Sequence, residues 1–411
     1  MGESTFMTSR SNSVSTSWLR RIRIHVDWPL AIAVGILLLV SFIFVFSASV
    51  EQSLKDDEPF TYYGARNLLW IVTGCILGLA ASAFNYRKIN KLFVMLIIAL
   101  VVGMLVYTVI ANKDEGAGRS IFGASGQPTE FVKLGLIIYL SVWLTSKQDV
   151  LSNWSLGLIP FGFIVGSLTM LIIMQGDFSA ALTVLMLGII MFILSGGKWR
   201  QTLVFIAVVF AGGALFLILF GGNRKDRIID FINGLKDPYL ASEHVQRASE
   251  AISSGGFLGV GLGESIAKYT GLPVPWTDSI FAVIVEEVGS IFGLGIIGIY
   301  MFILWRGLTI ANRTSDLTGK LIASGISIWI ALEAAVNIGA LINAAPFGGN
   351  ALPMISYGGS SMWATLIAVG ILMNISQSAS NEKSEEGRNF SAVVDLRRRN
   401  RRRSISRPSG S

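Results

Sequence analysis

The amino-acid sequence predicts an all-α polytopic membrane protein with about ten transmembrane helices. Its 411 residues are 52% hydrophobic and only 14% charged, whereas soluble proteins carry roughly 25% charged residues. Its mean hydropathy is +0.61. A helix needs about 20 residues to cross about 30 Å of hydrocarbon. Ten apolar stretches approach this length, near 28–49, 65–84, 91–110, 129–146, 156–175, 178–196, 201–220, 278–305, 319–341 and 356–377.

Each stretch is assigned to a span, and charges in the short loops indicate how the spans are oriented. The first stretch is too long for a typical cleaved signal peptide, so we expect it to be retained. The loops that follow even-numbered spans contain basic residues, namely Arg87 and Lys88, Lys147, Lys198 and Arg200, and Arg306 and Arg313. The alternate short loops contain acidic residues, and none is net positive. The positive-inside rule therefore places both termini in the cytoplasm.

This pattern divides the chain into three regions. Residues 1–27 and 379–411 are polar, basic tails that we expect to be disordered, and residues 28–378 form the membrane domain. The tails carry the whole net charge of +7, which favours orientation in the membrane over binding of nucleic acid. A long loop, about 221–277, is predicted to lie outside. Its residues 228–235 have the spacing of an apolar helix face, which would rest on the membrane or pack on the bundle.

The composition disfavours several kinds of active site. A single cysteine, Cys75, cannot form an intrachain disulfide or a multi-cysteine metal site. With only His25 and His244, we do not expect a zinc centre or a Ser-His-Asp triad. The glycines of 255–263 lack the context of a nucleotide site, and we expect them to form flexible or tightly turned backbone.

Ionisable residues inside apolar stretches are costly in a bilayer and mark candidate functional positions. Glu130 and Lys133 share one helix face, which predicts either an ion pair or a functional role. Glu286 and Glu287 fall within the eighth span, and we expect them roughly 12–14 Å below Asp278, near the middle of the bilayer. Glu333 lies in the ninth span. Asp278 opens the eighth span, where it would cap the helix or meet a polar lipid headgroup.

Five motifs in this order resemble the SEDS family (shape, elongation, division and sporulation), which includes FtsW, RodA and SpoVE. The motifs are QPTEFVK at 127–133, QGD at 175–177, the glycine-rich run at 255–268, TDSIFAVIVEEVG at 277–289 and PMISYGGSS at 353–361. The resemblance covers about residues 28–377. The segment 261–268 is closer to the FtsW pattern than to RodA.

The resemblance implies a bacterial peptidoglycan glycosyltransferase in the cytoplasmic membrane. Such enzymes polymerise lipid II, an undecaprenyl-linked disaccharide peptide, outside the membrane during division or elongation, paired with a class B penicillin-binding protein. Asp278 matches the family's essential aspartate. The motif residues expected to contribute to substrate binding are Gln127, Glu130, Asp177, Thr277 and Ser356.

Two positions before Asp278 depart from the family pattern. The family usually has Pro-Glu-x-His-Thr-Asp, whereas this chain has Val274 in place of the glutamate and Trp276 in place of the histidine. Gly176 also replaces the proline of the usual Gln-Pro-Asp. These differences put in doubt any role of the missing side chains in substrate binding.

The implied reaction needs one general base, for which Asp278 suffices, because the pyrophosphate leaving group is already anionic. Arg119, Lys133 and Lys268 are candidate cations for the pyrophosphate. We favour a functional role for Arg119 and pairing with Glu130 for Lys133. A divalent cation held by carboxylates would also serve, and no other cofactor is expected.

Two other functions stay open at this point. A transporter that flips lipid II would use the charges within spans to line a path, and a non-enzymatic scaffold would only recruit a transpeptidase. Polar groups gathered on one side of the membrane favour the polymerase, because a transporter should show them through the full depth.

Overall fold

A computed structural model describes residues 26–88, 91–111, 127–220 and 223–381, and this part of the chain is helical without strands. The helices are α1 (Trp28–Lys55), α2 (Tyr62–Ala83), α3 (Lys91–Ala111), α4 (Pro128–Ser146), α5 (Ile159–Met174), α6 (Phe178–Leu194), α7 (Trp199–Phe220), α8 (Asn223–Lys236), α9 (Glu243–Gly255), α10 (Ile280–Val288), α11 (Ser290–Arg313) and α12 (Leu317–Leu341). A last helix, Gly359–Asn381, follows, so it extends three residues beyond the predicted membrane domain.

The helices have the lengths and the inverted polarity of a membrane bundle. Among the described residues, eight helices are long and apolar enough to cross a membrane, and two shorter apolar helices, Phe178–Leu194 and Trp199–Gly213, coincide with further predicted spans. Large apolar side chains face outward, with Leu100 62% exposed, while the Lys133 side chain is only 1% exposed. Apolar side chains such as Leu100 are stable in contact with lipid, whereas a charged side chain such as Lys133 is costly there. The protein is therefore a multi-pass membrane protein.

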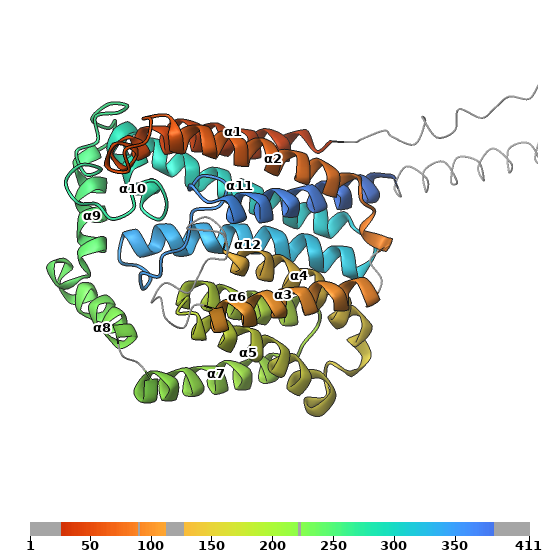
Figure 1. Ribbon diagram of the computed structural model, residues 1–411. Helices are drawn as coiled ribbons and strands as arrows, with labels where there is room; N and C mark the ends of the chain where they lie inside the picture. Colours follow the sequence, from red (N-terminus) through yellow and green to blue (C-terminus); the bar gives the residue numbers. More distant parts are fainter. Residues whose placement is uncertain (1–25, 89–90, 112–126, 221–222, 382–411) are drawn as a thin grey trace, which may run out of the picture.

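α12 is the centre of the bundle, where it packs against α4, α6, α9 and α11 (Figure 1). α1 and α12 end, and α4 and the last helix begin, at one end of the bundle. We call this end the Asp278 end. Asn337, one turn before the end of α12, donates a hydrogen bond to the backbone of Asp278 there.

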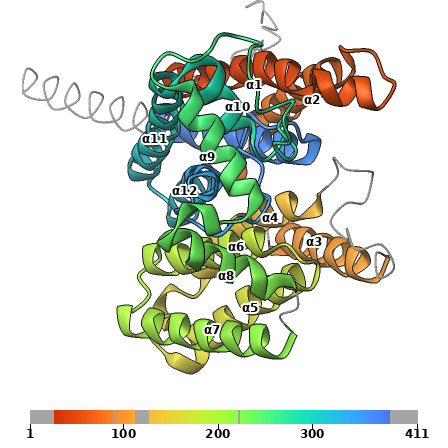
Figure 2. The same ribbon diagram turned by 90° about the vertical axis from the view of Figure 1, so that its left-hand side faces the viewer.

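The long loop contains the helices α8 and α9, which cross the Asp278 end, as Figure 2 shows. α8 turns apolar side chains outward, with Ile229, Ile232 and Leu235 exposed by 41%, 46% and 61%. The predicted apolar helix therefore exists, and its exposed face suits contact with a membrane surface.

The prediction of one continuous eighth span over 278–305 is wrong. The chain breaks at Gly289, with φ 91°, into α10 and α11. Gly293 lies against the Val285 and Phe281 side chains, which one straight helix would hold about 12 and about 18 Å away from it along the axis, since each residue rises about 1.5 Å. α10 therefore folds back on α11, and Glu286 and Glu287 do not lie along a helix that descends from Asp278.

The glycine-rich run explains why the break is stable. The amides of Val260 and Gly261 donate to the carbonyls of Glu286 and Glu287 at 2.9 and 3.0 Å, so they satisfy the end of α10. A Cβ at Gly255 would lie 2.2 Å from the carbonyl oxygen of Val285. The expected tight backbone of this run is thus a close packing surface for α10.

Candidate active site

Asp278 lies in the turn that leads into α10, and its side chain is partly exposed. Ser279, rather than Asp278, occupies the N-cap position of this helix. The turn therefore presents the Asp278 carboxylate just before the helix begins, at the Asp278 end of the bundle.

Two segments far along the chain hold the backbone of this turn. Asn337 Nδ2 on α12 donates to the carbonyl of Asp278 at 2.9 Å and to that of Asn350 at 2.6 Å. Ser356 Oγ donates to the carbonyl of Thr277 at 2.7 Å and accepts from the amide of Leu352 at 2.7 Å. The predicted site residues Thr277 and Ser356 thus meet as positioning groups, and Asp278 is fixed from two directions.

α9 supplies a third contact through His244. Ser279 Oγ donates to the carbonyl of Pro273 at 2.9 Å, so its oxygen can accept a hydrogen bond from His244 Nε2 at 2.6 Å. The His244 ring also lies on Phe347, with 3.8 Å between ring centroids. Burial lowers the pKa of His244 to about 4, so the imidazole is neutral at neutral pH and suits this donor role.

Aromatic rings surround the other side of the turn. Tyr63 lies 5.8 Å from Trp276 and 5.4 Å from Tyr357, measured between ring centroids. The amide of Tyr357 donates to the carbonyl of Trp276 at 3.0 Å. A Cβ at Gly359 would overlap the Trp70 ring, so only glycine lets the last helix begin this close to α2.

Gln127 and Glu130, at the start of α4, lie in the same part of the bundle. The amide of Gln127 donates to Ser360 Oγ at 2.9 Å, which joins the starts of α4 and the last helix. Glu130 accepts a hydrogen bond from Lys133 Nζ at 2.8 Å, and Lys133 also pairs with Glu333 on α12. Because Lys133 is 1% exposed, direct binding of a pyrophosphate by its ammonium does not fit this geometry.

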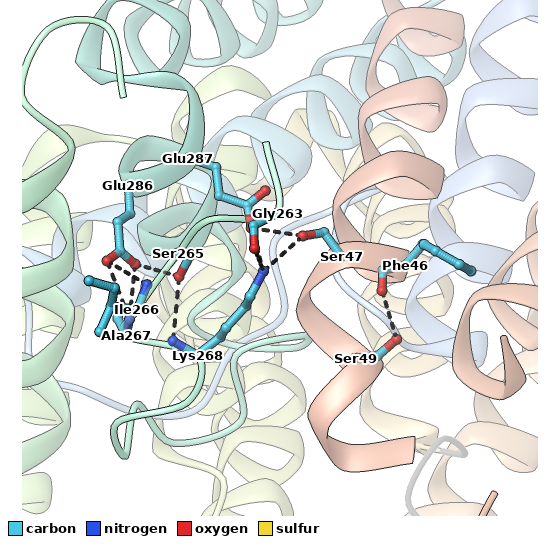
Figure 3. Close-up of polar contacts among 10 residues, drawn as sticks. All are labelled: Phe46, Ser47, Ser49, Gly263, Ser265, Ile266, Ala267, Lys268, Glu286 and Glu287. Carbon is cyan, nitrogen blue, oxygen red and sulfur yellow. Dashed lines mark hydrogen bonds and ion pairs between the residues drawn. The ribbon is translucent and has the colours of Figure 1, made fainter. Parts of the chain in front are cut away.

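Lys268 is also enclosed by protein groups, as Figure 3 shows. Its Nζ donates to Glu287 at 2.9 Å and to the carbonyl of Gly263 at 2.6 Å, and Ser47 Oγ on α1 donates to the same glutamate at 2.7 Å. At 4% exposure, Lys268 has little surface for a pyrophosphate. It ties the glycine-rich run to α1 and α10.

Glu286 organises the backbone beside Lys268 (Figure 3). Its carboxylate accepts from the amide of Ile266 at 3.1 Å, from that of Ala267 at 3.3 Å and from Ser265 Oγ at 2.5 Å. Both glutamates therefore serve as anchors for the segment that leads to Asp278.

Asp177 and Arg119 complete the predicted set. Asp177 is 4% exposed and caps α6 by accepting from the amide of Ala180 at 3.0 Å, so direct substrate binding does not fit its position. Arg119 lies outside the described residues. Within the described ranges, no group of three or more His, Cys, Asp or Glu side chains could hold a metal ion.

Sequence reasoning did not assign a role to several positioning residues. His244 and Asn337 carry no motif, and their contacts with the Asp278 turn span 35 and 59 positions of the chain. The pairing of Ser47 with Glu287 spans 240 positions. The only sequence signal was the presence of polar residues in or beside apolar helices.

These features define a class of protein: a multi-pass helical bundle that holds an acidic turn rigidly at one end. The chain belongs to the FtsW/RodA/SpoVE family, described as cell cycle proteins, which matches residues 28–381.

Named relatives cover most of this chain. A probable peptidoglycan glycosyltransferase FtsW of Trichlorobacter lovleyi is 34% identical, over 85% of this chain and 93% of the relative. Stage V sporulation protein E of Bacillus subtilis is also 34% identical, over 85% of this chain and 97% of that protein.

Solved structures show the same fold. One, described as the structural coordination of polymerization and crosslinking by a peptidoglycan synthase complex, aligns with a TM-score of 0.71 and 22% identity, over 87% of this chain and 99% of the other. RodA of Thermus thermophilus aligns with a TM-score of 0.61 and 23% identity, over 86% of this chain and 98% of RodA.

Proposed function

We propose that this protein is a peptidoglycan glycosyltransferase that polymerises lipid II, with Asp278 as general base. The observation that carries the proposal is the Asp278 turn itself, which α12, α9 and the 350–357 segment hold in one position. Relatives that are 34% and 31% identical to this chain are named probable peptidoglycan glycosyltransferase FtsW, which supports the same activity.

The proposed reaction joins two lipid-linked saccharides. A sugar hydroxyl of one lipid II attacks the anomeric carbon of the other, and the bond from that carbon to the pyrophosphate oxygen breaks. The leaving undecaprenyl pyrophosphate takes the bonding electrons, and Asp278 takes the proton of the attacking hydroxyl. A positioned base contributes about 10²–10⁴-fold, so substrate positioning and charge stabilisation supply the rest.

Arg119 is the cation that we propose for the pyrophosphate, because Lys133 and Lys268 already pair with carboxylates. A bidentate guanidinium matches phosphate oxygens. We further propose that the Asp278 end faces the outside of the bacterial cytoplasmic membrane, with both termini inside, and that a class B penicillin-binding protein is the partner transpeptidase.

The test is polymerisation of lipid II by the purified protein in liposomes, with and without a partner transpeptidase. Glycan strands that are sensitive to a muramidase support the proposal. Headgroup translocation without polymer would instead identify a flippase, and an inert protein that still recruits the transpeptidase would identify a scaffold. The charges within α4 and α12 pair with each other in the bundle, and this arrangement does not favour a translocation path.

A further inference from the structure

A cavity of about 290 Å³ opens beside the Asp278 turn, between the end of α1 and the segment 268–276. Its polar and aromatic walls include Glu51, Gln52 and Lys55 on α1, and Tyr269 and Trp276 on the other side. We propose that this cavity is a saccharide-binding subsite, which holds one sugar of the lipid-linked substrate or of the growing glycan strand. The proposal rests on the proposed function and names the part of the substrate that this cavity takes.

The charges of the walls favour a neutral ligand. Lys55 pairs with Glu51 at 2.5 Å, and Lys268, which also borders the cavity, pairs with Glu287 at 2.9 Å. Each ammonium group therefore already has a carboxylate partner, and the walls carry no excess positive charge that would favour an anionic pyrophosphate. Carboxylate, amide and ammonium groups together offer donors and acceptors for sugar hydroxyls.

Trp276 provides a fixed aromatic wall. Tyr63 braces its ring, and Tyr63 OH in turn donates to Asp56 Oδ2 at 2.5 Å. The carbonyl of Trp276 accepts from the amide of Tyr357 at 3.0 Å. A ring held in this way loses little conformational entropy when a sugar packs its C–H face against it.

The backbone of the same wall is strained. Val274, which lines the cavity, has φ 43°, a conformation that is a genuine outlier for a β-branched residue. Such strained residues are concentrated at ligand and active sites. Val274 and Trp276 are also the two positions that differ from the usual motif, so this wall departs from the usual family pattern.

The size of the cavity limits what it holds. Sites for whole drug-sized ligands measure roughly 300–1,000 Å³, so about 290 Å³ suits one sugar rather than the complete disaccharide peptide. The cavity is therefore a subsite next to the Asp278 turn, and its occupant would continue beyond it.

The test compares Trp276→Ala and Trp276→Phe with wild type in lipid II polymerisation, with KM, kcat and strand length measured separately. We expect Trp276→Ala to raise KM for lipid II about tenfold, which corresponds to about 1.4 kcal/mol, while Trp276→Phe keeps most of the affinity. Gln52→Leu should raise KM in the same direction. The matched control is Trp154→Ala, because Trp154 is 48% exposed but follows α4 at the opposite end of the bundle.

The two sources of the sugar give different results. A raised KM identifies the incoming lipid II, whereas shorter strands at unchanged KM identify the growing strand. Unchanged KM and strand length in both Trp276→Ala and Gln52→Leu would overturn the subsite while the polymerase activity stands. If the wild-type protein forms no polymer, saturation-transfer NMR with the soluble disaccharide peptide still tests the cavity. A signal that Trp276→Ala does not weaken would then reject it.

Discussion

Lys133 bridges two carboxylates at the contact between α4 and α12, and its removal should destabilise the bundle strongly. Its side chain is 1% exposed, and those of Glu130 and Glu333 are 8% and 3% exposed. Lys133→Met keeps most of the side-chain volume but leaves both carboxylates without a counter-ion. Removing one partner of a buried ion pair costs about 3–5 kcal/mol, and we expect Lys133→Met to lower the free energy of unfolding by this amount.

The measurement is the free energy of unfolding in mixed micelles titrated with a denaturing detergent. Lys55→Met is the matched control, because Lys55 pairs with Glu51 but is 65% exposed, and such a pair contributes about 0–1 kcal/mol. The double variant Lys133→Met/Glu333→Gln should lose less than the two single losses together, since it buries one fewer unpaired charge. A loss in Lys133→Met no larger than that in Lys55→Met would refute the reasoning.

Three further predictions concern the break, the turn and pH. Gly289→Ala should destabilise the protein and reduce activity, because a Cβ there would lie 2.2 Å from the carbonyl oxygen of Phe257, whereas Gly295→Ala, with open space around it, should be neutral in the same unfolding assay. Asn337→Leu and Ser356→Ala should each lower kcat more than they raise KM, because both free the Asp278 turn; a change in KM alone would contradict the positioning role. His244 has an unfolded pKa of 6.5 and a folded pKa of about 4, so between these pH values the unfolded chain binds more protons and stability falls as pH falls. His244→Gln removes this titrating group, so its free energy of unfolding should decrease less over this pH range. A pH dependence equal to that of the wild-type protein would contradict the role of His244.

Much of the bundle could be predicted from the sequence because spans depend on local composition. Long apolar stretches coincide with helices at nine of the ten predicted positions in the described part of the chain, without any tertiary information. The prediction of the eighth span was wrong because Gly289 breaks a long, mainly apolar stretch. A single glycine inside such a stretch does not by itself predict a turn. The contacts that stabilise this break come from residues 255–261, about 30 positions earlier.

The candidate site was predictable only in part. Spacing of three residues was enough to expect the Lys133–Glu130 pair, but nothing local pointed to Glu333 as the second partner. The sequence does not show that Lys268 is buried and paired, because its partners Glu287 and Ser47 lie on α10 and α1 and meet it only in the folded bundle. Lys268 was therefore a candidate for binding a pyrophosphate. The sequence shows which charged side chains lie in apolar segments, where burial is costly. The packing of helices that are distant in the chain decides which oppositely charged side chain pairs with each of them.

In the proposed reaction, Asp278 accepts the proton of the attacking sugar hydroxyl. The most direct test of this step is kcat for lipid II polymerisation by Asp278→Asn, which keeps the shape of the side chain but removes the base. We expect kcat to fall about 10²–10⁴-fold, with an unfolding free energy and a lipid II affinity close to those of the wild-type protein. A folded Asp278→Asn variant that polymerises lipid II at a near-normal rate would contradict the mechanism.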